Sequence, residues 1–379
     1  MKIINVDNEY LQSHRYGWYN IINYIKNNID TDILLIDYVD KYFNAWLELP
    51  KEIICDNKVY HFQNKDAYYH VNDKDKNDIF IYYDSINIYH FIKWYPEYNE
   101  FKILYGEVIQ NMIKKYNISI IEKPWIGIIH YPEFIKEMNY SSTESFEMII
   151  QTDIFIKSLK NCKCLITLSN YLKNYIYNIL QKYNYNINIY VLYHPTDFNC
   201  KLFSYNSFLT NNYKSIIQIG FWMRKMNTIF LLQTKFNKLW FPGGDYWFEM
   251  FKIIYPNYTN YLNDSSVEIK LNLSNEMYDD YLSKNICLLN VFNASANNTL
   301  LECIVRNTPI IVNKHPAIIE YLGIDYPLYF NNMDELNILV NSNTFYEQIL
   351  NAHIYLYKMD KTIFTIDNFS QSFHHIINQ

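Results

Sequence analysis

The stretch Cys287-Leu-Leu-Asn-Val-Phe-Asn-Ala-Ser-Ala-Asn-Asn-Thr-Leu-Leu-Glu-Cys-Ile-Val-Arg-Asn-Thr-Pro-Ile-Ile-Val-Asn313 decides the fold. It begins with an apolar strand pattern and passes through a loop of small polar residues into a helical pattern. A second apolar strand pattern follows the helix. A strand, a helix and a strand in this order predict one unit of a parallel α/β sheet.

The start of this helix carries residue types that favour helix capping, namely Ser295, Asn297, Asn298 and Thr299. The free N–H groups of the first turn would make an anion site. Glu302 lies about one turn into the helix, where a carboxylate can accept hydrogen bonds from a ribose diol. An ordinary capped helix with a glutamate that favours the helix dipole explains the same residues, so composition alone leaves both interpretations open.

Short apolar runs alternate with helical patterns along the whole chain, which predicts an α/β fold with two doubly wound, Rossmann-like domains in tandem. In the first half the predicted strands are Lys2–Val6, Ile33–Asp37, Ile79–Tyr83, Trp125–His130, Cys164–Leu168 and Ile189–Tyr193. The predicted helices there are Tyr19–Asn27, Glu107–Tyr116, Ser145–Ser158 and Tyr171–Tyr183. In the second half the predicted strands are Ser215–Ile219, Lys238–Phe241, Val267–Leu271, Cys287–Val291, Pro309–Asn313 and Leu328–Phe330. The predicted helices there are Arg224–Leu232, Asp245–Ile254, Ser274–Ser283, Asn298–Arg306, Pro316–Gly323, Met333–Asn341, Phe345–Tyr357 and Asp367–Ile377.

The periodicity lapses between the two series, and this lapse predicts the domain boundaries. We expect an N-terminal domain of residues 1–198, a connection of residues 199–213 and a C-terminal domain of residues 214–379. The last helix is expected to pack back toward the N-terminal domain. Two such domains are expected to form a ligand cleft between the carboxyl ends of their strands. The polar stretch Lys51–Asp78 predicts an insertion or a small additional hairpin.

Composition excludes several classes of protein. The chain has 379 residues and a net charge of −6, without a lysine or arginine block, which argues against a nucleic-acid binder. With only 7 glycines it has neither the GxGxxG dinucleotide motif nor the P-loop motif. Neither a signal peptide nor a transmembrane helix is expected, so we expect a cytoplasmic protein. We expect no metal and no cofactor, because the scattered cysteines, histidines and carboxylates lack metal-ligand spacing. The excess of Asn, Ile, Lys and Tyr is typical of an AT-rich genome.

Two further segments carry candidate site residues. The segment Lys214-Ser-Ile-Ile-Gln-Ile-Gly-Phe-Trp-Met-Arg-Lys225 is a strand that ends at Gly220, followed by a cationic pair, Arg224 and Lys225. Fixed cations there would suit an anionic ligand, although a solvated helix start fits as well. In the first half, Trp125-Ile-Gly-Ile-Ile-His130 ends in a histidine at the carboxyl end of a strand, where it bonds either a ligand or the protein itself.

These segments resemble GT-B glycosyltransferases of the retaining, GT4-like group. Glu302 matches the second glutamate of their E-x7-E motif, which holds the nucleotide ribose. Arg224 and Lys225 match the cations that hold the donor diphosphate without a metal, in a loop that begins at Gly220. His130 stands where the family often has a histidine near the donor sugar. The resemblance covers residues 125–330 and is strongest over residues 215–323. It implies that residues 1–198 form the acceptor-side domain and residues 214–379 the nucleotide-sugar donor domain.

The sequence departs from that pattern at two positions. Asn307 replaces the glycine of the turn after the helix, and asparagine also adopts the left-handed conformation that this turn needs. Ala294 stands where the family has the first glutamate, which touches the donor sugar. We therefore expect Ser295, Asn297 and Asn298 to recognise the sugar. Asn298 and Thr299 are expected to contact the phosphate or the sugar.

The resemblance implies transfer of a sugar from a nucleotide-sugar donor to the hydroxyl group of a glycan or other acceptor in glycan biosynthesis, with retention and without metal. Two alternatives stay open. One is a sugar-nucleotide epimerase of the same fold, and the other is a nucleotide-sugar-binding protein that has lost catalysis, which Ala294 favours. The tyrosine-rich surface is compatible with self-association as a homo-oligomer, and base composition explains the tyrosines equally well.

Overall fold

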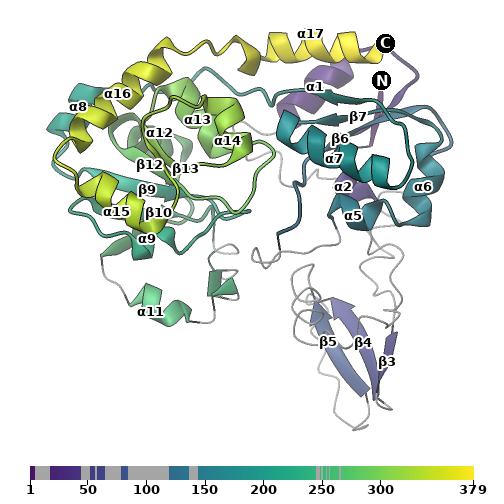
Figure 1. Ribbon diagram of the computed structural model, residues 1–379, viewed down its shortest axis with the longest axis horizontal. Helices are drawn as coiled ribbons and strands as arrows, with labels where there is room; N and C mark the ends of the chain where they lie inside the picture. Colours follow the sequence, from purple (N-terminus) through teal and green to yellow (C-terminus); the bar gives the residue numbers. More distant parts are fainter. Residues whose placement is uncertain are drawn as a thin grey trace. The chain divides into compact units, whose positions relative to one another are not determined.

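The computed structural model describes residues 1–4, 18–43, 52–55, 58–64, 78–83, 119–135, 144–244, 257–263 and 266–379, together with residues 248, 251, 252, 254 and 255 (Figure 1). Its contacts divide the chain into two compact units. Most of the first unit comes from residues 22–167 and 172–191. Most of the second unit comes from residues 192–379, and residues 168–171 also belong to it.

The first unit is built on a parallel sheet of five strands in the order β1-β2-β6-β7-β8. The strands are β1 (Lys2–Ile4), β2 (Leu34–Ile36), β6 (Trp125–Ile129), β7 (Cys162–Thr167) and β8 (Ile189–Val191). The helices between them are α1 (Trp18–Asn28), α2 (Val39–Tyr42), α5 (Phe146–Ile149), α6 (Asp153–Leu159) and α7 (Asn170–Lys182). All five residues of β6 are buried, as expected for a central strand of a parallel sheet that is covered on both faces.

An additional three-stranded sheet corrects one strand prediction. It consists of β3 (Glu52–Cys55), β4 (Lys58–Asn64) and β5 (Asp78–Tyr83). The β3–β4 pair is antiparallel, which confirms a hairpin in the polar insertion. The predicted strand Ile79–Tyr83 exists as β5, but it pairs in parallel with β4 rather than within the five-stranded sheet. A hydrophobic pattern identifies a strand without identifying its partner, which explains the error.

The helix prediction Ser145–Ser158 was also wrong in part, because the segment forms two helices, α5 and α6. Thr152 separates them with an extended backbone, and its hydroxyl accepts a hydrogen bond from the N–H of Phe155 at the start of α6. Threonine favours this capping role over a place inside a helix. The predicted helix Glu107–Tyr116 lies outside the described residues.

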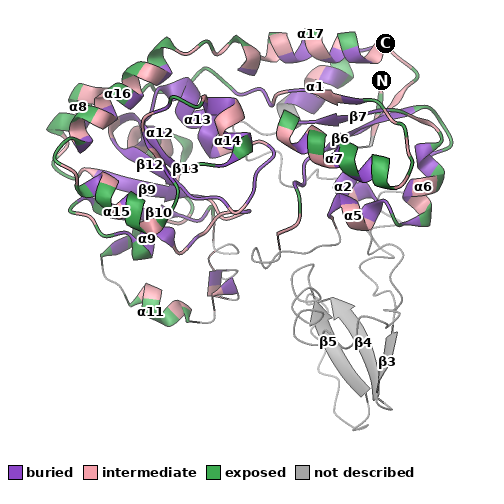
Figure 2. Ribbon diagram, in the orientation of Figure 1, coloured by how far each residue is buried: buried purple, intermediate pink, exposed green. Residues whose placement is uncertain are grey.

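The second unit contains a parallel sheet of six strands in the order β11-β10-β9-β12-β13-β14. The strands are β9 (Ser215–Ile219), β10 (Asn237–Phe241), β11 (Val267–Ile269), β12 (Ile286–Leu289), β13 (Ile310–Asn313) and β14 (Tyr329–Phe330). All six were predicted to within two residues at either end. In order of appearance these strands are arranged 3-2-1-4-5-6, so the chain reverses direction across the sheet between β9 and β12. Both strands at this switch point are buried throughout, as Figure 2 shows.

The helices of the second unit are α8 (Tyr205–Thr210), α9 (Thr228–Leu231), α11 (Tyr258–Leu262), α12 (Asn275–Lys284), α13 (Asn298–Arg306), α14 (Pro316–Leu322), α15 (Met333–Asn341), α16 (Phe345–Lys358), the 3-10 helix η4 (Thr362–Phe364) and α17 (Ile366–Ile377). Helix α8 lies in the segment predicted as an irregular connection, where it packs against α12. The predicted helix Arg224–Leu232 begins only at Thr228, and most of the predicted helix Asp245–Ile254 falls outside the described residues.

Helix α13 has the predicted bounds, and the structure gives the reason for both ends. The side chain of Asn297 accepts a hydrogen bond from the N–H of Leu300 and caps the amino end. At the carboxyl end Asn307 adopts the left-handed conformation with a φ of 58°, which confirms that asparagine fills the role of the glycine. Among the described residues, no helix is both long and apolar enough to cross a membrane.

Candidate functional site

The candidate site lies where the strand order of the second unit reverses. The loops that follow β9 and β12 leave neighbouring strands at the carboxyl edge of the sheet, where open α/β sheets bind ligands. The backbones of these loops are paired: Phe292 N–H donates to the carbonyl of Met223 at 2.9 Å, and Lys225 N–H donates to that of Asn290 at 2.8 Å. This pairing explains why helix α9 begins only after residues 224–227.

Arg224 is the centre of this site. Its Nη2 donates to Oγ1 of Thr299 at 3.0 Å, and it also lies 3.4 Å from Oδ1 of Asn297. The guanidinium group is therefore fixed against the amino end of α13, so the cation and the free N–H groups of the first helical turn lie together. A preorganised cation beside a helix amino end is an arrangement suited to an anion.

Gly220 is required by this arrangement for two reasons. Its φ is +76°, a conformation that side chains disfavour. A Cβ atom at this position would also lie 2.5 Å from Nη1 and 2.8 Å from Cζ of Arg224. The glycine therefore makes room for the guanidinium group.

Lys225 lies beside Arg224 and is held more loosely. Its Nζ lies 5.4 Å from the centre of the Phe292 ring, within the range of a cation–π contact. In the part of the chain that the structure describes, no carboxylate forms an ion pair with this ammonium group. Its charge is therefore available to an anion.

Glu302 lies one turn beyond Thr299 on α13 and is 5% exposed. The hydroxyl of Tyr278 on α12 donates to its Oε2 at 2.5 Å. Burial raises the pKa of Glu302 to about 6, against the hydrogen bond from Tyr278 and the charges of Arg306 and Arg224, which lower it. At neutral pH the carboxyl group is thus mostly ionised and can accept hydrogen bonds.

Ser295 and Asn298 complete the predicted set in the same loop and helix start. Ser295 is buried at 2% exposure, whereas Asn298 is half-buried. Ala294, at the position of the missing glutamate, is 3% exposed, and its N–H donates to the side chain of its neighbour Asn293. The structure therefore brings Gly220, Arg224, Asn297 and Thr299 into one cluster, with Lys225, Ser295, Asn298 and Glu302 next to it in the chain.

His130 belongs to the first unit and follows β6. Its Nε2 lies 2.9 Å from the carbonyl oxygen of Asp37, which can only accept, so this nitrogen carries a proton. The ring stacks on Tyr38 with centroids 3.8 Å apart. The backbone N–H of His130 donates to Oδ1 of Asp40 at 2.8 Å. The predicted histidine is thus held in place by three neighbouring residues of the segment after β2.

Asp40 is expected to make the stability of the protein depend on pH. Burial raises its pKa from 3.8 to about 6, so the folded state binds a proton more tightly than the unfolded chain does. This contribution favours folding below about pH 4 and is lost as the pH rises toward 6. We expect the unfolding free energy of the wild type, relative to Asp40→Asn, to fall by about 2 kcal/mol between about pH 4.5 and 7.5.

Urea denaturation of the two proteins at both pH values measures this change. The difference in unfolding free energy between the two proteins is compared at the two pH values. Any pH-independent effect of changing the acceptor for the N–H of His130 cancels in this comparison. A difference that stays the same at the two pH values would contradict the raised pKa of Asp40.

The sequence did not identify three residues that support the site. Asn313 accepts from the N–H of Val291 at 2.8 Å and donates to its carbonyl at 3.0 Å, which fixes the loop after β12. Asn290 donates to Oγ1 of Thr228 at 3.0 Å and ties that loop to α9. The third is Tyr278, which lies four residues before the buried Leu282 on α12, and this helical spacing was a signal that it faces inward.

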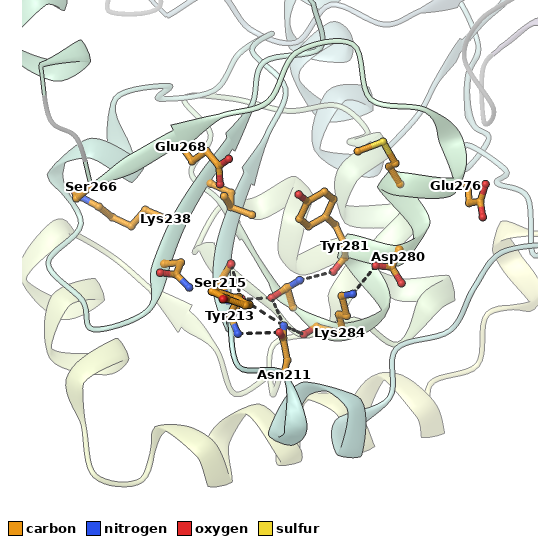
Figure 3. A pocket seen from close by; sticks show the side chains of 14 residues that line it. Asn211, Tyr213, Ser215, Lys238, Ser266, Glu268, Glu276, Asp280, Tyr281 and Lys284 are labelled. Carbon is orange, nitrogen blue, oxygen red and sulfur yellow. Dashed lines mark hydrogen bonds and ion pairs between the residues drawn. The ribbon is translucent and has the colours of Figure 1, made fainter.

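A separate cavity of about 870 Å³ lies between α12 and the beginnings of β9, β10 and β11 (Figure 3). None of the predicted site residues lines it. Asp280 in its wall pairs with Lys284 and with Lys201, so this charge is already neutralised. We therefore place the candidate site at the switch point and not in this cavity. Among the described residues, no three His, Cys, Asp or Glu side chains are grouped to hold a metal ion.

Comparisons with known proteins show the fold. No protein-family profile and no curated protein matches the chain. The structure of HepE from Anabaena, in complex with UDP and glucose, superposes with a TM-score of 0.52 over 76% of this chain and 80% of HepE, at 9% identity. Sucrose-phosphate synthase from Thermosynechococcus elongatus superposes with a TM-score of 0.51 over 91% of this chain and 88% of the synthase, at 12% identity. The chain thus has the GT-B fold that the sequence resemblance predicted.

Proposed function

We propose that this chain is a glycosyltransferase that moves a sugar from a nucleotide-sugar donor to a hydroxyl acceptor in glycan biosynthesis, with retention of configuration and without a metal. The observation that carries the proposal is Arg224, fixed by Thr299 and Asn297 at the amino end of α13 on the switch point of the sheet. HepE, which shares the fold, is known with UDP and glucose bound, and this supports a nucleotide-sugar donor.

The roles of the residues follow from the charge that the reaction creates. When the bond between the sugar and the diphosphate breaks, negative charge builds up on the leaving diphosphate. Arg224, Lys225 and the first N–H groups of α13 would stabilise this charge, which makes a metal ion unnecessary. Asn298 and Thr299 would contact the phosphate or the sugar, Ser295 and Asn297 would contribute to sugar recognition, and Glu302 would hold the ribose.

His130 would lie near the reacting sugar, where its ring can form a hydrogen bond to a hydroxyl group. The hydrogen bond of its ring to Asp37 and the stacking on Tyr38 favour a fixed orientation of the ring, as a group that positions a sugar requires. We place the reaction in the cytoplasm, where nucleotide-sugars would be the donors.

A second candidate function is binding of a nucleotide-sugar without transfer. Ala294 favours it, because its buried methyl group cannot replace a carboxylate as a hydrogen-bond acceptor for the sugar. Release of free nucleotide or transfer of the sugar would indicate a transferase, whereas a protein that only binds the nucleotide-sugar would produce neither. Formation of an epimer without an acceptor would instead indicate an epimerase.

A thermal-shift screen against UDP, GDP, dTDP, CMP and their sugars, with and without Mg²⁺, tests the proposal. A ligand present at 100 times its Kd stabilises the folded state by about 2.7 kcal/mol, which raises the apparent Tm. We expect one nucleoside diphosphate and its sugars to raise the Tm to the same extent with and without Mg²⁺. No shift with any compound would contradict the proposal, and a shift that depends on Mg²⁺ would contradict its metal-independent form.

A further inference from the structure

The hydrogen bond between Tyr278 and Glu302 changes what the candidate ribose site can recognise. Tyr278 faces the sheet side of α12, with its ring 6.4 Å from that of Phe241. Its hydroxyl donates to Oε2 of Glu302 at 2.5 Å. Burial and the neighbouring carboxylate raise the pKa of Tyr278 well above its usual value, so the hydroxyl keeps its proton and remains a donor.

This bond occupies one of the two carboxylate oxygens of Glu302. The other oxygen, Oε1, has no hydrogen-bond partner among the described residues. A carboxylate with both oxygens open can accept from both hydroxyls of a ribose, one on each oxygen. A pentose hydroxyl at Oε2 would have to share that oxygen with the tyrosine, so Oε1 is the stronger acceptor that Glu302 offers to the pentose.

We propose that Tyr278 determines which pentose the donor site accepts, because its hydroxyl competes with a pentose hydroxyl for Oε2 of Glu302 and so admits 2′-deoxyribonucleotides about as well as ribonucleotides. The 3′-hydroxyl, which both classes carry, satisfies the open oxygen in either case. Loss of the 2′-hydroxyl then removes no bond to Glu302. This inference rests on the proposed function, since it assumes that a nucleotide binds at Glu302.

Equilibrium binding of matched nucleoside diphosphates tests the inference, with UDP against dUDP and GDP against dGDP as probes. For the base that binds, we expect the Kd values of the two pentoses to differ by less than about threefold in the wild type. In Tyr278→Phe both oxygens are open, so the ribonucleotide should bind at least about tenfold more tightly than its deoxy form. Measurement at about pH 8 keeps Glu302 ionised in both proteins, since the tyrosine hydrogen bond that lowers its pKa is lost in the variant.

Tyr281→Phe is the matched control. It removes a hydroxyl from the same helix, three residues away, where the side chain lines the separate cavity (Figure 3). We expect it to keep the wild-type ratio of the two Kd values. A wild type that prefers the ribonucleotide tenfold or more, or a Tyr278→Phe variant with an unchanged ratio, would overturn the inference alone. Absence of binding by every nucleoside diphosphate would overturn the proposed function itself.

Discussion

Replacing Arg224 with alanine is expected to lower kcat/KM for release of the nucleoside diphosphate by about 100- to 1000-fold, the range seen when a preorganised charge-stabilising group is removed. The guanidinium group is fixed by Thr299 and Asn297 before any ligand arrives, so it needs no rearrangement during the reaction. Its contribution should therefore increase as the diphosphate gains charge. The loss should affect kcat more strongly than the affinity for the donor.

A steady-state assay of nucleoside diphosphate release, with the donor that the thermal-shift screen identifies, measures this effect. Lys235→Ala is the control, because it removes one cation of the same unit, exposed and near the ring of Tyr346. The control should keep wild-type activity. Turnover of Arg224→Ala within threefold of the wild type would contradict the role of Arg224.

Much of the fold could be predicted from the second half of the sequence because its local signals agree with its tertiary structure. In β9 and β12 every residue is buried, and both strands are mostly apolar in sequence, with Ser215 and Gln218 of β9 as the exceptions. Helix α13 has a capping asparagine at each end, and asparagine is a residue type that favours both positions, so both ends could be predicted from the sequence. Where a capping residue lies inside an apolar periodic segment, as Thr152 does, the same method missed the break.

Only those site residues could be predicted that belong to a local sequence motif. Arg224 and Thr299 were identified from two separate segments, but their direct contact depends on the neighbouring positions of β9 and β12, which no local pattern contains. The start of α9 was misplaced for the same reason, since residues 224 and 225 pair with the loop after β12. The partner of Glu302 was missed because Tyr278 lies 24 residues away on another helix.

Replacement of Arg306 with methionine should destabilise the second unit by about 3–5 kcal/mol, the usual loss when one partner of a buried ion pair is removed. The side chain of Arg306 is fully buried in the last turn of α13, and its Nη2 lies 2.7 Å from Oδ1 of Asp279 on α12. Its Nη1 donates to the carbonyl of Lys201 at 3.2 Å. Without the guanidinium group, the carboxylate of Asp279, 12% exposed, would lose its buried cation.

The double variant Arg306→Met, Asp279→Leu separates the loss of the pair from the loss of packing. Removing both charges leaves no uncompensated ion, and apolar replacements of buried pairs are often neutral or stabilising. We therefore expect the double variant to recover more than half of the stability lost in Arg306→Met, as measured by urea denaturation at neutral pH. The same stability in both variants would mean that packing, and not the charge of Asp279, dominates. Since Glu302 and Arg306 lie on one helix, the single variant should also weaken nucleotide binding, and recovery in the double variant should restore it.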